Sequence, residues 1–341
     1  MHLGPTGEFI LFSFIKIICV IGVLMPMIAY SVWVERKVSA FIQDRVGPNR
    51  VGPAGLLQPL ADGLKFVLKE DFTPAHVRKA YFWLAPAITM IPAFLTIAVI
   101  PFGSQLGHSK MVIADLNVGI LYTFGIVSLG VYGIVLAGYA SNSKYPFLGG
   151  IRSSAQMISY EIAMGMSVIP VFLLVGDLNL SRVIEWQAQH GWMIVYAPFC
   201  FFVFLVSAFA ETNRLPFDLP ESETELVAGY NTEYGSMKFA LFFLGEYANM
   251  IAASAMMVTL FLGGWTLPFI SAPASSIGAG IFHIAVFLGK LIFFMVLMIW
   301  VRWMLPRFRY DQLMDLGWRR FVPFALANIF FYAFVLWARA S

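Results

Sequence analysis

The chain has 341 residues, of which 60% are apolar and only 12% are charged, and its formal net charge is +3. An ordinary soluble domain carries about 25% charged residues, and a soluble chain of this composition would have too few polar groups to cover its surface. The composition therefore excludes a disordered chain, a nucleic-acid binder and a cytosolic enzyme. It indicates an all-α protein that crosses a membrane many times.

Eight stretches are long and apolar enough for transmembrane helices, which need about 20 residues each. They lie at Phe9–Val34, Ala80–Phe102, Val118–Ala140, Gln156–Val175, Trp192–Ala210, Phe239–Leu262, Gly280–Trp300 and Phe321–Trp337. They predict a single integral membrane domain over residues 1–341, with loops at about 35–79, 141–155, 211–238 and 301–320 on one side.

Lysines and arginines predict which side these loops face. The four loops hold 17 of the 22 Lys and Arg residues, the opposite side holds three, and Lys16 and Lys290 lie within spans. Cytoplasmic loops are enriched in Lys and Arg. We therefore expect the four loops to be cytoplasmic and both termini to lie outside, in a bacterial inner membrane or the equivalent mitochondrial membrane.

The first basic loop contains a predicted amphipathic helix at Gly55–Asp71. Gln58, Asp62, Lys65 and Lys69 recur at helical spacing, and leucines fill the opposite face. Such a helix can anchor a protein at the membrane surface, or it can form a wall over an amphiphilic ligand. The spacing leaves both interpretations open.

Acidic residues collect near the same side of the membrane. Glu161 and Glu246 are predicted inside spans four and six, and Glu211 ends span five. An ionisable group in a span is a candidate functional residue, with an ion pair to Lys290 or Arg302 as the structural alternative. Neighbouring buried acids can exchange protons in coupled steps, so these residues suggest a proton path or a charge-sensing relay.

The loop after span five extends this acidic region. Arg214 is the only Lys or Arg between Glu211 and Glu233. The loop's other acids are Asp218, Glu221, Glu223, Glu225 and Glu233. Solvated loop acids are the plain alternative to a functional role here.

Motifs for redox centres and nucleotides are missing from the sequence. The two cysteines, Cys19 and Cys200, lie far apart, and no CxxC, GxxxxGK or GxGxxG occurs. Of the five histidines, only His283 borders an apolar span. We expect no metal, haem, iron–sulfur or nucleotide site in this chain.

Four longer blocks carry a family resemblance. They read ERKVSAFIQDRVGPNRVGPAGLLQPLADGLK at 35–65, SNSKYPFLGGIRSSAQMISYE at 141–161, AETNRLPFDLPESETELVAGYNTEY at 210–234 and PRFRYDQLMDLGW at 306–318. Together they resemble the quinone-site membrane subunits of respiratory complex I, the family of mitochondrial NADH dehydrogenase subunit 1 and its counterpart in the bacterial proton-pumping NADH:quinone oxidoreductase. The likeness covers almost the whole chain.

The resemblance implies a subunit of a proton-translocating NADH:quinone oxidoreductase without a complete active site of its own. NADH, FMN and iron–sulfur clusters would belong to partner subunits, and a quinone (ubiquinone or menaquinone) would bind partly here. The implied partners are the peripheral-arm quinone-site and iron–sulfur subunits, other membrane-arm subunits including antiporter-like ones, and membrane lipid.

The resemblance also implies roles for particular residues. Its proton path falls on Glu161, Glu211, Glu221, Glu223 and Glu225, with Arg214 beside it, and we add Glu246 because it is predicted inside a span. Its quinone tunnel falls on Arg36, Arg45, Asp62, Phe217 and Tyr230. Arg302, Arg307 and Arg309 would face the peripheral arm. Plainer roles stay open: membrane anchoring for Arg36 and Arg45, a pair with Lys65 or Lys69 for Asp62, and packing for the two aromatic residues.

One position departs from the family pattern. Gly130 stands in the segment Ser128–Tyr132, where some bacterial relatives have an acid. If an acid is needed there, water or Glu161 has to substitute.

Two other functions remain as alternatives. One is the homologous subunit of a membrane-bound hydrogenase-type complex, and the other is a stand-alone proton-coupled transporter. The clustering of acids toward one side and the elaborate cytoplasmic loops disfavour the transporter.

Overall fold

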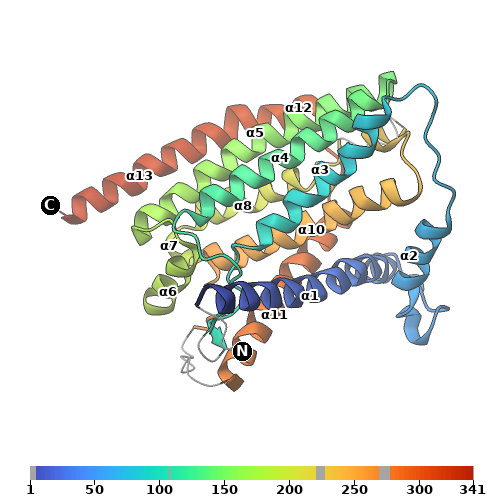
Figure 1. Cartoon of the computed structure of the whole chain (residues 1–341). Helices are drawn as coiled ribbons and strands as arrows, with labels where there is room; N and C mark the ends of the chain where they lie inside the picture. Colours follow the sequence, from blue (N-terminus) through green and yellow to red (C-terminus); the bar gives the residue numbers. More distant parts are fainter. Residues whose placement is uncertain (1–4, 107–108, 220–226, 269–276, 341) are drawn as a thin grey trace.

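The computed structural model describes residues 5–106, 109–219, 227–268 and 277–340, and its long helices lie side by side in one bundle (Figure 1). The elements are α1 (Pro5–Ile42), η1 (Pro53–Gly55), α2 (Gln58–Leu68), α3 (Lys79–Ile97), β1 (Gln105–Leu106), β2 (Ser109–Lys110), α4 (Gly119–Ala140), α5 (Lys144–Val175), α6 (Leu180–His190), α7 (Met193–Tyr196), α8 (Pro198–Glu211), η2 (Gly229–Asn231), α10 (Ser236–Phe261), α11 (Ile277–Met304), α12 (Tyr310–Asp315), η3 (Leu316–Phe321) and α13 (Val322–Ala340). The two short strands pair antiparallel.

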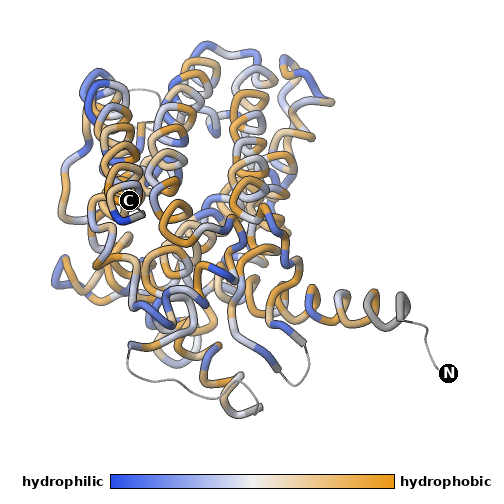
Figure 2. The backbone as a smooth tube through the Cα atoms, turned by 90° about the vertical axis from the view of Figure 1, so that its left-hand side faces the viewer, coloured by the Kyte–Doolittle hydropathy of each residue, from blue (hydrophilic) through white to orange (hydrophobic). Residues whose placement is uncertain are grey.

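Seven helical stretches among the described residues are long and apolar enough to cross a membrane. They are α1, α3, α4, α5, α10, α11 and the continuous run through α12, η3 and α13. Along the helices the tube is mostly hydrophobic, and hydrophilic residues gather at ends and turns (Figure 2). The prediction of an all-α polytopic membrane protein is confirmed.

The fifth predicted span is divided into two helices. Its apolar stretch forms the single turn α7 and the 14-residue helix α8, and Ala197 separates them in a non-helical conformation. Pro198 follows directly, and a proline disfavours helical geometry at the residue before it. The continuous span predicted at Trp192–Ala210 was therefore wrong at its start.

Two helices extend further than their apolar stretches. Helix α1 continues through Glu35 and Arg36 to Ile42, and α5 begins at Lys144 instead of Gln156. Glutamate, lysine and arginine are good helix formers, so a helix does not end where its apolar stretch ends. As a result, residues predicted in loops occupy fixed faces of long helices.

The helices differ in how deeply the bundle buries them. Two-thirds of the most apolar window of α10 is buried (67%), compared with 6% for α1. The core around α5 and α10 includes Tyr160, whose hydroxyl donates to the carbonyl of Leu313, 2.9 Å away. Helix α1 thus lies at the edge of the bundle and exposes most of its apolar surface.

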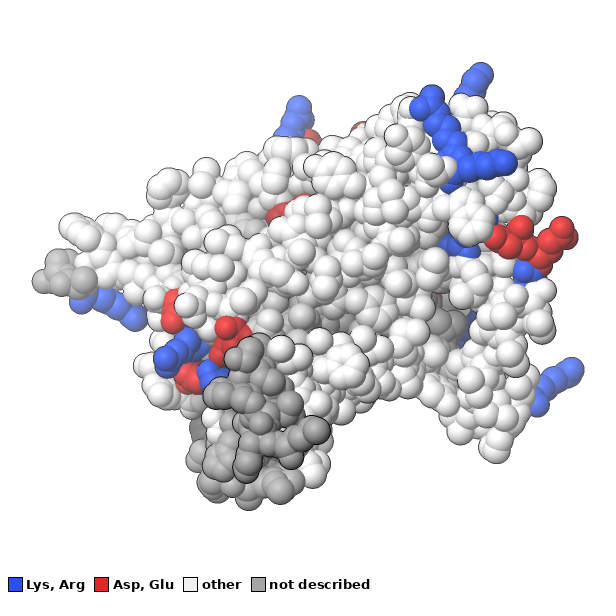
Figure 3. All heavy atoms as spheres, in the orientation of Figure 1, with Lys and Arg blue, Asp and Glu red and all other residues white. Residues whose placement is uncertain are grey.

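Charged side chains mark the two ends of the bundle. In Figure 3 most Lys and Arg side chains gather at the right-hand end, a smaller mixed group lies at the lower left, and the surface between them is almost free of charge. Helix α2 lies at the right-hand end and buries none of its residues (Figure 1). The predicted amphipathic helix is confirmed, shorter at both ends.

Candidate functional site

A cluster of charges is buried where α1, α10 and α11 meet the loop after α8. Arg214 lies at its centre, with only 5% of its side chain exposed. Its Nη1 donates to both carboxylate oxygens of Glu35, at 3.0 and 2.8 Å, and its Nε lies 2.7 Å from Oε1 of Glu246. One guanidinium therefore joins an acid of the first helix to an acid of α10.

Two further residues complete this charge cluster, which we define as Glu35, Arg214, Glu246, Tyr247 and Arg302. Tyr247 donates its hydroxyl to Oε2 of Glu35 at 2.7 Å, and its ring lies 4.5 Å from the Arg214 guanidinium carbon. Arg302 forms a second ion pair with Glu35. Two acids and two bases balance in charge, and buried charges require such pairing.

Arg214 is a permanent cation in this setting. Burial alone would lower the pKa of Arg214, but the neighbouring Glu246, Tyr247 and Glu35 raise it well above its usual value. It therefore keeps its charge when an acid beside it gains or loses a proton.

A second buried pair lies beside the charge cluster, in the same loop. Arg307 donates to Oδ2 of Asp218 at 2.9 Å. Burial raises the pKa of Asp218, although the charge of Arg307 and a hydrogen bond from it act in the opposite direction. Asp218 can therefore take up a proton more readily than an exposed aspartate.

A small cavity connects the charge cluster with the end of α8. Glu246 and Glu211 both line it, together with Asn249 and Gly130. Its volume is about 20 Å³, which is enough for about one water molecule. A side-chain Cβ built at Gly130 would meet no heavy atom within 4 Å. The position that departs from the family pattern thus leaves space beside two acids.

Glu161 lies further along the same region, on α5. It accepts a hydrogen bond from Ser128 of α4, and its alternative partners, Lys290 and Arg302, bind elsewhere. Lys290 donates to the carbonyls of Leu262, Gly264 and Thr266 at 2.5–2.9 Å, so the predicted structural ion pair with Glu161 or Glu246 was wrong for this lysine. For Arg302 the acid is Glu35.

The structure brings three of the predicted quinone-site residues together near α2. Arg36 pairs with Asp62 at 2.7 Å, rather than Asp62 pairing with Lys65 or Lys69 of its own helix. Arg36, Arg45 and Gln58 line a cavity of about 410 Å³ between the end of α1 and α2. Gln58 also donates to Asp62 at 3.1 Å.

The two predicted aromatic residues lie apart from that cavity, in the core. Phe217 is 3% exposed and stacks on Phe308, and Tyr230 is 6% exposed and packs edge-to-face on Phe242. Tyr230 also lines the small cavity beside Glu211 and Glu246. Arg309 is exposed and pairs with Asp311.

Glu221, Glu223 and Glu225 lie outside the described residues, so their predicted place in the proton path stays a prediction. Over the described ranges, no group of three or more metal-ligating side chains occurs.

Glu35 was not among the predicted site residues. It is the first residue after the predicted apolar stretch, and the count of Lys and Arg that set the orientation ignores acids. Its signal was present: it precedes the bases Arg36 and Lys37 and continues a long helical pattern. Its partners lie 179 and 267 residues away, a distance that no local pattern reveals.

The bundle and its buried cluster define a multi-pass helical membrane protein with ionisable groups held inside it. The family model described as NADH dehydrogenase matches residues 15–333. An H-type membrane component of the NADH-quinone oxidoreductase of Cytophaga hutchinsonii is 48% identical over 94% of this chain and 96% of that protein. The corresponding H-type component of the NADH-quinone oxidoreductase of Rhodospirillum rubrum is 50% identical over 94% of this chain and 93% of its own length. The chain belongs to this NADH dehydrogenase family.

Proposed function

We propose that this chain forms part of the quinone-binding tunnel of an NADH-quinone oxidoreductase and couples quinone reduction to proton translocation. As a member of the family it is a membrane subunit, and the redox activity belongs to the assembled complex. The names of the relatives favour this function over a hydrogenase-type complex or a transporter. The observation that carries the coupling role is the set of buried acids joined through Arg214.

The region around α2 suits a quinone. A quinone has carbonyl oxygens that accept hydrogen bonds and an apolar tail. Arg36 and Arg45 supply donors at the cavity beside α2, and Asp62 holds Arg36 in place. The leucines of α2 are exposed at the same end, where a tail could pass between the membrane and the cavity.

The charge cluster suits proton coupling. A reduced quinone takes up protons, and their removal from nearby acids leaves negative charge. Arg214 contacts Glu35 and Glu246 together, so a change at one carboxylate alters the electrostatic environment of the other. Glu246 shares the small cavity with Glu211, and a water beside Gly130 would extend the path toward α8.

The remaining expectations concern the setting of the subunit. The charge-rich end would face the cytoplasm of a bacterial inner membrane, with both termini outside. Exposed bases there, among them Arg309, Arg319 and Arg320, would contact peripheral-arm subunits, which carry NADH, FMN and iron–sulfur clusters.

Replacement of the path acids in the assembled complex tests this proposal. Glu161→Gln and Glu211→Gln should each lower NADH:quinone turnover and the proton gradient in reconstituted vesicles by at least tenfold, as expected for loss of a proton-transfer group. Glu185→Gln is the matched control, because Glu185 is half-exposed and pairs with its neighbour Arg182. Fully assembled complexes with normal turnover and gradient in both path variants would contradict the proton role.

A further inference from the structure

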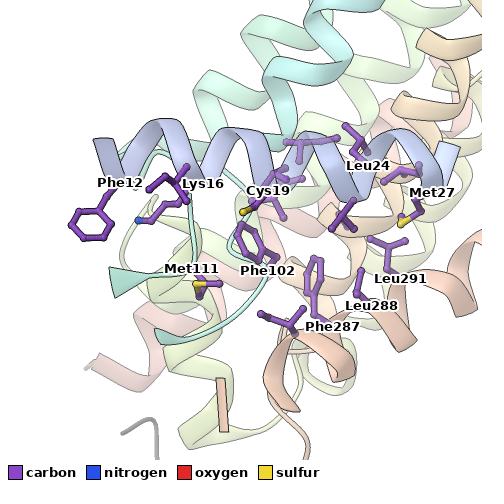
Figure 4. A pocket seen from close by; sticks show the side chains of 18 residues that line it. Phe12, Lys16, Cys19, Leu24, Met27, Phe102, Met111, Phe287, Leu288 and Leu291 are labelled. Atoms are coloured by element: carbon purple, nitrogen blue, oxygen red, sulfur yellow. The ribbon is translucent and has the colours of Figure 1, made fainter. Parts of the chain in front are cut away.

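A second cavity lies at the opposite end of α1 from the quinone-site candidates. It has a volume of about 460 Å³ and is walled by α1, α10, α11 and the segment after α3. In Figure 4 its labelled residues run along α1 from Phe12 and Lys16 to Met27, with Phe287, Leu288 and Leu291 of α11 facing them. Lys16 is the one charged residue among the described side chains that line it.

We propose that this cavity binds one acyl chain of an anionic phospholipid whose phosphate lies against Lys16. The distance along α1 from Lys16 to Met27 is about 16 Å at about 1.5 Å per residue. Half of a hydrocarbon core of about 30 Å is about 15 Å. The cavity therefore has the length of one membrane leaflet, with its cation at one end.

The width of the cavity agrees with a single hydrocarbon chain. Its volume spread over about 16 Å gives a mean cross-section of about 28 Å², whereas an α-helix about 10 Å across would need about 80 Å². A transmembrane helix of a partner would not fit within it. The apolar walls exclude a polar ligand, and the volume lies in the range of small-molecule sites.

Lys16 supplies the charge complementarity. Its Nζ donates to the carbonyl of Val112 at 3.3 Å, and no carboxylate in the described part of the chain forms an ion pair with it. An ammonium group in a span is costly unless it reaches the polar boundary or an anion. A lipid phosphate at the membrane boundary supplies that anion, and a neutral quinone does not.

The position separates this site from the proposed quinone tunnel. Lys16 and Arg36 are twenty residues apart on the same helix, which corresponds to about 30 Å. The acyl-chain cavity and the cavity at Arg36 therefore belong to opposite faces of the membrane.

Protection of Cys19 provides the test. Cys19 lines the cavity and is exposed, whereas Cys200 is buried. The assembled complex, delipidated in mild detergent, would be mixed with phosphatidylglycerol, phosphatidylcholine or ubiquinone, and N-ethylmaleimide labelling of the Cys19 peptide would be measured by mass spectrometry. We expect phosphatidylglycerol to protect Cys19 at a concentration at least tenfold lower than phosphatidylcholine.

Variants assign that protection to the lysine. Lys16→Met should raise the protecting concentration of phosphatidylglycerol at least tenfold, and Lys16→Arg should keep it close to wild type. Arg182→Gln is the matched control, because Arg182 is exposed outside the cavity. Equal protection by both lipids, stronger protection by ubiquinone, or no protection would each overturn the proposal. The comparison of lipids on the wild-type complex decides even if Lys16→Met fails to assemble.

Discussion

Replacement of Arg214 by methionine removes the centre of the charge cluster while keeping a side chain of similar length. Glu35 and Glu246 then remain buried, with 9% and 19% of their side chains exposed, and only Arg302 is left to pair with them. The variant therefore tests whether the fold depends on this one cation.

The structure sets the magnitude of the effect. Breaking a buried ion pair by removing one partner costs about 3–5 kcal/mol, because an uncompensated charge stays behind. That loss lowers the ratio of folded to unfolded subunit by about a hundred- to several-thousand-fold. The double variant Arg214→Met/Glu246→Gln removes one of the stranded charges as well, and it should recover about 2 kcal/mol of the loss through the coupling between neighbours.

The assay is the temperature at which half of the purified complex loses its assembly on native gels. The expected order is Arg214→Met lowest, then the double variant, then wild type. Arg309→Met is the control, because its ion pair is exposed and worth at most about 1 kcal/mol. A single variant as stable as wild type, or a double variant no better than the single one, would refute the reasoning.

Three further predictions follow from other contacts. Asp62→Asn should raise the apparent quinone KM several-fold with normal assembly, since the Arg36 side chain it holds is 45% exposed and contributes little to stability; steady-state kinetics checks this, and an unchanged KM would make the pair structural. Lys290→Met should destabilise the subunit by about 2–4 kcal/mol, because three carbonyls after α10 lose a charged donor; thermal unfolding measures it, and Lys290→Arg should lose less. Burial alone would raise the pKa of Asp115, but hydrogen bonds from Lys110 and Asn179 lower it overall. Asp115→Asn should therefore reduce stability at neutral pH, and the difference from wild type should vanish as the pH falls below about 3.9; a difference that persists at pH 3 would contradict this.

The sequence predicted the features that depend on long local patterns. Apolar stretches of about 20 residues locate spans such as α4 and α10, and polar residues at helical spacing locate α2, because these signals lie within a few turns of helix. Helix ends were less accurate, since α5 continues through polar residues back to Lys144. The break before Pro198 was missed because the surrounding stretch is uniformly apolar.

The candidate site depended on contacts between distant parts of the chain. Burial of acids predicted that Glu246 and Glu211 matter, and the structure brings both to one cavity. Their pairing could not be predicted, because Glu35 reaches Arg214 only through tertiary packing. The same reason explains why Lys290 was assigned an acid partner when it binds backbone carbonyls.

The contacts of Glu35 also set an order of events during synthesis. The acid lies on the first span, yet its two cationic partners are made 179 and 267 residues later. At about 5–20 residues per second, the ribosome needs about 9–36 s to reach Arg214 and longer to reach Arg302. During that interval Glu35 has to stay hydrated at the membrane boundary or carry a proton. The first helix therefore reaches its final seat only after most of the chain has been inserted, and truncated chains that end before Arg214 should leave it undocked.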